Sequence, residues 1–177
     1  MALDSDNVRV AVSGSVYVAP TGTTAPTTSS SALDAGFIDL GYVSADGITE
    51  NIDRTTNQIR AWQNGSLVRE VTSEGTYSVE LTFIETSEAV LELYYGTEQA
   101  GGALDVDPTS TGGRKSFVID VIDGSLVERT YIPAGEITSV GQRTLASGEA
   151  IGYQVTITAY ADAGSTTFKK FFSQLEA

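Results

Sequence analysis

The side chains of this chain that could do chemistry are mainly carboxylates. Its 177 residues include 23 Asp and Glu, 10 Lys and Arg, and neither histidine nor cysteine. Without histidine the chain lacks the commonest general base and the commonest metal ligand. Without cysteine it has no thiolate ligand and no disulfide, which suits a protein made and assembled in a cytoplasm. A catalytic or metal site would therefore have to be built from Asp, Glu and Lys.

Three groups of carboxylates are close enough in sequence to be considered as sites: Glu85 with Glu88 and Glu92, Asp120 with Asp123 and Glu128, and Asp105 with Asp107. The first group has helical spacing, and a solvated helix face explains it better than a metal or acid–base site. The second matches no EF-hand calcium loop, and the third is an unspecific pair in a loop.

Other chemical motifs are missing as well. None of the lysines follows a serine in a Ser-x-x-Lys arrangement, and no glycine-rich phosphate loop is present. The basic and aromatic run from Phe168 to Phe172 could touch nucleic acid, but a buried C-terminal anchor is the simpler interpretation. We therefore expect a protein that is not an enzyme, with no catalytic residues, no cofactor and no metal.

The net charge of −13 argues against general attraction to nucleic acid, because such affinity comes mainly from Lys and Arg. The acidity can serve solubility alone, or it can form a surface past which DNA slides without binding. No apolar run approaches the ~20 residues that span a bilayer, so we expect no membrane helix. The acidic start, Met1 to Asp6, predicts no signal peptide.

Period-two alternation of apolar and polar residues is the dominant pattern along the chain, and it predicts β-strands. The clearest strands are 76–83 and 151–159, whose apolar residues fall on one face. The opposite, hydroxyl-rich faces include Ser78, Glu80, Thr156 and Thr158. Strands of this kind belong to antiparallel sheets with one wet face. Further strands are expected at 8–12, 16–19, 37–43, 117–122, 127–132 and 136–140, and 168–172 could be a strand or a helical turn.

One helix is expected at 87–95, with Ser87 as a cap, Glu88 in the first turn and Gly96 as the stop. Its apolar arc is wide, so something besides its own sheet should cover part of it. The Thr-, Ser- and Pro-rich tract 21–31 predicts an exposed loop or a mobile arm. No tract separates two cores, so residues 1–177 should form one domain.

Residues 47–75 have the pattern of a long extended hairpin arm. Asn64-Gly65 favours a type I′ turn, across which the flanking residues can pair. The arm carries Arg54, Arg60, Trp62 and Arg69, including the single tryptophan of the chain. Aromatic residues and Arg are enriched at protein interfaces, so these four residues are predicted to contact another subunit.

The stretch 37–96 carries a resemblance, through three blocks: Gly41 to Arg54, Ile59 to Gln63 with Val68-Arg69, and Thr82 to Gly96. In this order the blocks resemble the major tail tube proteins of siphophages that infect actinobacteria. The resemblance covers about a third of the chain. Its most specific parts are Ala61-Trp62-Gln63 and the Ile84-Glu85-Thr86 … Leu91-Glu92-Leu93-Tyr94-Tyr95-Gly96 block.

The resemblance implies a structural virion protein whose subunits form hexameric rings. The inner strands of a ring would join into one barrel, and the rings would stack into a tail tube through which genomic DNA passes without specific binding. The implied partners are further copies of the chain, a tape measure protein and tail-end proteins, and no membrane. The implied location is the virion tail, after assembly in the host cytoplasm.

Together, the residues and the resemblance predict a mainly β fold: antiparallel β-sandwich or barrel-forming sheets, one flanking α-helix and the extended arm. Ser78, Glu80, Thr156 and Thr158 are expected to face the lumen. The alternative is a monomeric immunoglobulin-like or carbohydrate-binding β-sandwich on a virion or cell surface. A tube subunit polymerises with itself, whereas a binding module stays monomeric and binds glycans.

Overall fold

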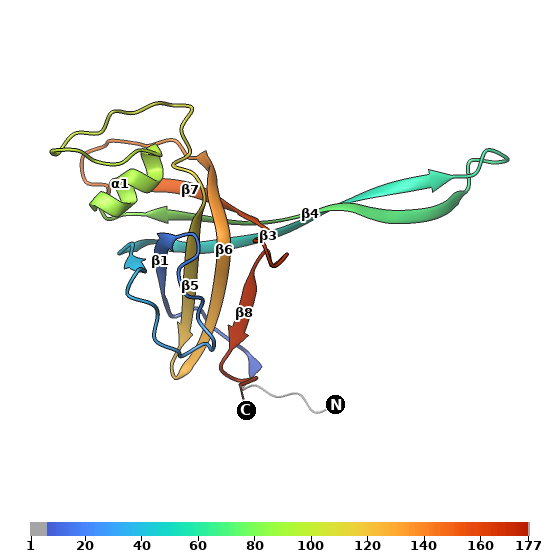
Figure 1. Cartoon of the computed structure of the whole chain (residues 1–177), viewed down its shortest axis with the longest axis horizontal. Helices are drawn as coiled ribbons and strands as arrows, with labels where there is room; N and C mark the ends of the chain where they lie inside the picture. The colour runs from blue at the N-terminus through green and yellow to red at the C-terminus, as the bar shows by residue number, and fades with distance from the viewer. Residues whose placement is uncertain (1–6, 177) are drawn as a thin grey trace.

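The computed structural model describes residues 7–176, which contain one helix and one antiparallel sheet of eight strands (Figure 1). The strands are β1 (Ser13–Pro20), β2 (Ile38–Asp39), β3 (Val43–Arg60), β4 (Leu67–Phe83), β5 (Lys115–Asp123), β6 (Leu126–Val140), β7 (Tyr153–Tyr160) and β8 (Lys169–Phe172). The helix α1 spans Glu88–Tyr95. The predicted mainly β, antiparallel fold with a single flanking helix is confirmed.

The strand order is β2-β1-β5-β6-β7-β4-β3, with β8 paired to β6 beside this path. The long strand β6 changes partners along its length. Its first half pairs with β5 on one side and β8 on the other, and its second half pairs with β7. The sheet is therefore continuous through β6 and packs against itself around one hydrophobic core.

The core is built from one face of each central strand. Tyr77, Val79, Leu81 and Phe83 of β4 are each at most 2% exposed, and β7 contributes Tyr153, Val155 and Ile157 in the same way. The alternation predicted at 76–83 matches the burial, and that predicted at 151–159 matches from Tyr153 onward, whereas Ile151 lies before β7 and is exposed. Helix α1 adds Val90 and Leu93 to the same core, and the Tyr94 and Tyr153 rings meet edge to face at 5.4 Å. Burial of these side chains supplies the main folding energy of the sheet.

The helix ends are those the sequence predicts. Ser87 precedes the helix in an extended conformation, and its hydroxyl accepts a hydrogen bond from the Val90 N–H. Gly96 ends it at φ 65°, in the left-handed region that glycine adopts without strain.

Strand β6 joins two segments that the sequence predicts as separate strands, 127–132 and 136–140. Pro133 lies between them and lacks an N–H, which normally excludes proline from a paired strand. Here Pro133 sits at a β-bulge in the pairing with β5, between the Phe117–Ile132 and Lys115–Gly135 pairs. The Ser116 hydroxyl donates to the Pro133 carbonyl at 2.8 Å. A bulged residue forms no ladder hydrogen bond, so the N–H that Pro133 lacks is not needed there and β6 continues past it.

Three further local predictions are resolved. The segment 8–12 is wrong as a strand: Val12 N–H donates to Ile122 O and Val10 N–H to the Asp123 carboxylate, but residues 8–12 have no strand pairing in the described chain. Of 37–43, only Ile38–Asp39 and the first residue of β3 pair. The run 168–172 is a strand rather than a helical turn. Gly124, at φ 62°, lies in the turn between β5 and β6.

The 21–31 tract is a partly exposed loop anchored to the body of the fold, which favours the exposed loop of the prediction over its alternative, a mobile arm. Arg129 donates to the backbone carbonyls of Ser31 at 2.6 Å and Thr28 at 3.3 Å. Ser29 is buried, and both its N–H and its hydroxyl donate to the Glu176 carboxylate. These contacts come from residues 98 to 147 positions away, which local sequence composition cannot reveal.

Strands β3 and β4 continue past the body as a hairpin that projects far from the rest of the molecule (Figure 1). The inner pairs, Ile48–Leu81 to Ile52–Tyr77, belong to the body of the sheet. From Leu67 to Thr76, every residue of β4 is exposed. The distal half of the hairpin therefore has no core of its own, and a two-stranded ribbon of this kind is marginally stable in water.

Gly135→Val is expected to destabilise the fold. A Cβ at Gly135 would lie 2.7 Å from the Phe117 ring and 3.0 Å from Ile157, at the place where β6 changes partners. Overpacking a dense core costs about 1–3 kcal/mol. Urea unfolding followed by circular dichroism should show this loss. The matched control is Gly75→Val in the exposed hairpin, where an added Cβ meets only one atom, at 4.0 Å. Equal unfolding midpoints for the two variants would contradict the account.

Candidate assembly surfaces

The polar face of β4 and β7 is the first candidate surface. Ser78 pairs directly with Thr158, and Glu80 pairs with Thr156, so the four predicted lumen residues share one face of the sheet. This face lies opposite the buried side chains of the same strands. Gln154 donates a short hydrogen bond to Glu80, and the Thr138 and Thr158 hydroxyls lie 2.7 Å apart. The face is hydrogen-bonded and open to solvent in the single chain.

Glu136 is a residue of this face that sequence reasoning missed. It pairs with Thr158, and its carboxylate accepts from the Thr111 hydroxyl at 2.6 Å and lies 3.9 Å from the Arg114 guanidinium. The Arg114 guanidinium also stacks over the Tyr160 ring at 4.5 Å. A bulge between Ile137 and Ser139 shifts the alternation of β6, so its polar residues do not follow a simple period of two.

Two open edges flank this face. Strand β3 ends the path of the described sheet, so its outer side has no strand partner among residues 7–176. At the other end, Glu136–Val140 of β6 pair with β7 on one side, while β5 pairs with β6 only as far as Gly135. Unpaired edges of this kind are templates for pairing with another chain.

The tip of the hairpin is the second candidate surface. Trp62 is 98% exposed, and Arg54, Arg60 and Arg69 are exposed on the flanking strands. The structure thus places all four predicted interface residues on the projecting hairpin, free to contact another molecule. Arg60 donates to the Gly65 carbonyl at 3.2 Å and to Gln58 at 2.8 Å, which holds it beside the tip.

The turn at the tip differs from the predicted type I′ turn at Asn64-Gly65. Strand pairing ends at Arg60 and Leu67, so the loop is 61–66. Within it the Gly65 N–H donates to the Ala61 carbonyl at 3.0 Å, and the Asn64 side chain accepts from the Ser66 N–H. Gly65 has φ 69°, whereas Asn64 is not in the left-handed region that a type I′ turn requires. The wider loop is what presents Trp62 to solvent.

Members of all three carboxylate groups considered as sites make structural contacts. Asp120 forms a buried, two-pronged ion pair with Arg129, with both distances 2.7 Å. Hydrogen bonding to Asp120 raises the pKa of Arg129 against the cost of burial. Glu85 accepts from the Tyr42 N–H and Glu92 from the Gln99 N–H. Asp107 accepts from Thr109, and its pKa is lowered by the hydrogen bonds from that backbone N–H and hydroxyl.

Two other kinds of site are absent from the part of the chain that the structure describes. Among residues 7–176, no group of three or more carboxylates is arranged to hold a metal ion. Over the same residues, no helix is long and apolar enough to cross a membrane.

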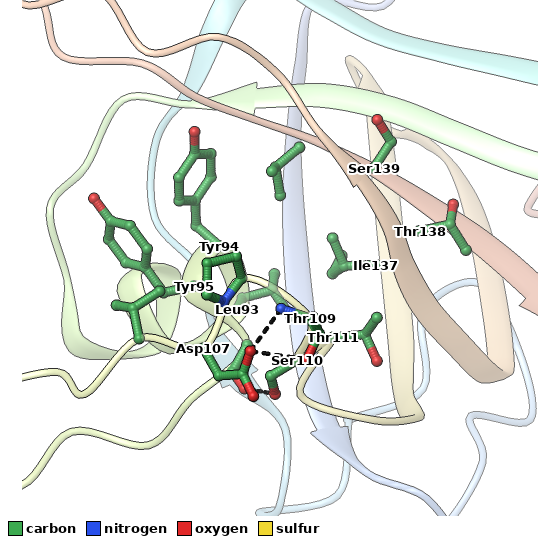
Figure 2. A pocket seen from close by; sticks show the side chains of 14 residues that line it. Leu93, Tyr94, Tyr95, Asp107, Thr109, Ser110, Thr111, Ile137, Thr138 and Ser139 are labelled. Carbon is green, nitrogen blue, oxygen red and sulfur yellow. Dashed lines mark hydrogen bonds between the residues drawn. The ribbon is translucent and has the colours of Figure 1, made fainter.

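A groove lies between α1, the loop 106–111 and the open edge of β6 (Figure 2). Its volume is about 300 Å³, and its walls are mainly apolar. Figure 2 shows Tyr94 and Tyr95 of the helix on one side, Ile137 to Ser139 of β6 on the other, and Asp107 to Thr111 between them. The loop is tied to the helix end, because the Ser110 hydroxyl donates to the Gly96 carbonyl at 2.5 Å.

The comparison with family models settles what kind of protein carries these surfaces. Residues 1–175 match the model described as "Phage tail tube protein". The chain belongs to the phage tail tube protein family. This family is one of structural proteins, and the match extends the resemblance from about a third of the sequence to nearly all of it.

Solved structures agree on the fold. A chain of an extracellular contractile injection system, in its sheath–tube complex, superposes with a TM-score of 0.53 at 10% identity, covering 96% of this chain and 93% of that one. A chain of the anti-feeding prophage tube-terminating cap gives 0.50 at 11%, covering 96% and 98%. No curated protein matches the chain by sequence.

In this tail tube protein, one ionic contact joins the base of the hairpin to the body. The Lys170 ammonium of β8 lies 2.6 Å from Glu50 of β3 and 2.7 Å from Glu128 of β6. Burial alone would lower the pKa of Lys170, but the hydrogen bonds and charges of Glu128 and Glu50 outweigh it and raise the pKa. Beside it, Phe168 stacks on Tyr77 of β4 at 4.0 Å. The C-terminal strand therefore holds β3 and β4 where the hairpin leaves the core.

Lys170→Met is expected to lower the free energy of unfolding by about 1–2 kcal/mol, because it leaves two neighbouring carboxylates without their cation. Lys169→Met, at the exposed neighbouring position on β8, is the control and should change little. The raised pKa means that the stabilisation is present below pH 10.5 and is lost as pH rises through the folded-state pKa. Urea melts at pH 7 and above pH 11 measure both effects. A difference between Lys170→Met and the parent that stays constant over this range would refute the assignment.

Proposed function

We propose that this tail tube protein assembles into hexameric rings that stack into the tube of a phage tail, and that the polar face of β4 and β7 lines the lumen. The observation that carries the proposal is the two-sided character of the β6-β7-β4-β3 sheet. One face is buried in the core of the chain, and the other carries Ser78, Glu80, Thr156 and Thr158 in direct register. A sheet inside a closed ring must present one face to water, and this face suits that position.

The open edges support ring closure. Pairing the outer side of β3 in one subunit with Glu136–Val140 of β6 in the next would extend the sheet from subunit to subunit. Such a contact joins two different surfaces, and it closes into a ring when the rotation between subunits allows it. Closure removes the unpaired edges, which otherwise favour uncontrolled aggregation.

Charge supports conduction of DNA. Glu80 and Glu136 lie on the proposed lumen face, and the whole chain has a net charge of −13. Binding of DNA depends on neutralising its phosphates with Lys and Arg. A lumen with few cations would therefore let genomic DNA pass without specific binding.

The finer assignment rests on the resemblance of residues 37–96. It supports a siphophage that infects actinobacteria, with a tape measure protein and tail-end proteins as partners. We place the protein in the virion tail, after assembly in the host cytoplasm. The proposed role requires no catalytic activity, and the family match favours it over a monomeric glycan-binding module.

The hairpin would provide contacts between rings. Arg54, Arg60, Trp62 and Arg69 are exposed on it, and burial of a large aromatic residue at an interface contributes about 2 kcal/mol or more. The hairpin would gain order from the neighbouring subunit, because on its own it lacks a core.

Negative-stain electron microscopy of the concentrated, purified protein is the direct test. The proposal predicts rings or tubes of one fixed diameter. Size-exclusion chromatography at several salt concentrations serves as the companion measurement. A strictly monomeric species in every condition, with no particles on the grid, would contradict the proposal and would favour a monomeric binding module.

A further inference from the structure

The hairpin tip and the α1 groove lie at opposite ends of the molecule. Figure 1, drawn with the longest axis horizontal, shows the β3–β4 tip at one end and α1 with the loop after it at the other. The tip therefore cannot reach the groove of its own subunit. Both surfaces are left free for other molecules in the single chain.

The tip is basic and apolar in an acidic protein. Residues 59–69 contain Arg60 and Arg69 and no Asp or Glu, in a chain with a net charge of −13. Besides Trp62, at 98% exposed, Val68 is 65% exposed. Nothing in residues 7–176 covers these apolar side chains, so water surrounds them until a partner binds.

The groove end has the complementary composition. Residues 85–111 contain six carboxylates and no Lys or Arg: Glu85, Glu88, Glu92, Glu98, Asp105 and Asp107. The nearby cations are Arg143, bonded to the Tyr95 hydroxyl, Arg114, 3.9 Å from Glu136, and Lys115, so six carboxylates against three cations leave this end acidic. Asp107 lies on the groove itself, and Val106 and Val140 in its lining are 45% and 47% exposed. At about 300 Å³, the groove is far larger than one water molecule needs, so a bulky side chain can enter it.

We propose that Trp62 of one subunit inserts among the side chains of the groove between α1, the 106–111 loop and β6 of a subunit in the adjacent ring, with Arg60 beside Asp107, while the backbone edge of β6 pairs with β3 within the ring. This assignment rests on the proposed tube and names the surface that receives the hairpin. An apolar anchor in a pocket, surrounded by opposite charges, is the usual arrangement of an interface hot spot. Because tip and groove are different surfaces at opposite ends, each bound subunit still offers one of them, and the contact repeats along an open stack.

The first test is a disulfide between engineered cysteines, which is specific because the chain contains no cysteine. Gln63→Cys in the tip is combined with Val106→Cys in the groove, both at exposed positions. Assembled, mildly oxidised tubes should give a ladder of linked subunits on a non-reducing gel, whereas unassembled subunits should stay single. The control combines Gln63→Cys with Ser30→Cys, which is exposed in the 21–31 tract, and should give no ladder.

The second test uses charge and size. Trp62→Ala should keep the circular dichroism spectrum of the parent and slow tube growth about tenfold or more, measured by light scattering. Arg60→Glu should slow growth similarly, and Arg60→Glu combined with Asp107→Arg should restore most of it, because the two charges are exchanged.

The outcomes separate this inference from the proposed function. If tubes assemble but the Gln63→Cys and Val106→Cys pair does not cross-link, and if Trp62→Ala tubes grow at the parental rate, then the groove is not the receptor. The proposed tube itself would still stand. A groove filled by another tail protein would likewise give no cross-link to the tip and would overturn the inference. Failure of the parent chain to form tubes at all overturns the proposed function, and the inference falls with it.

Discussion

The structure depends on one constraint: the four strands β6, β7, β4 and β3 form a sheet that can bury only one of its faces. Tyr77, Val79, Leu81 and Phe83 commit β4 to the core on one side, and a shift of one residue would exchange the two faces completely. Within residues 7–176, the other face and both outer edges remain open. Assembly with further copies is the step that would complete such a sheet, and the proposed tube follows from this requirement.

The remaining parts of the fold hold this sheet in place. The bulge at Pro133 and the absence of a side chain at Gly135 let β6 leave β5 and join β7 without a break. Lys170 ties β8 and β6 to the base of the hairpin through Glu128 and Glu50. The buried Arg129–Asp120 pair fixes the 21–31 tract against the opposite half of the sheet. The contacts at the base of the hairpin thus set its direction, because its distal half has no core of its own.

Much of the fold could be predicted from local sequence, wherever a single local pattern decides the structure. Strict alternation identified the faces of 76–83 and 153–159, and the Ser87 and Gly96 signals placed the helix ends. The failures have non-local causes. Pro133 concealed the continuity of β6, because proline is tolerated only through a bulge that β5 helps to form. Arg129 finds its partners 98 and 101 residues away, so composition alone could not decide whether the 21–31 tract is anchored or mobile. Glu136 was missed because a second bulge interrupts the alternation of β6.

The central claim is that the open edges of this sheet pair with other copies of the chain, and hydrogen–deuterium exchange of monomer and assembled particles tests it most directly. In the monomer, the outward-pointing amides of residues 43–52 should exchange rapidly, since β3 has a strand partner on one side only among the described residues. After assembly, the account predicts strong new protection at alternate amides of this stretch and along 136–140. Unchanged, rapid exchange at both edges in assembled particles would contradict it.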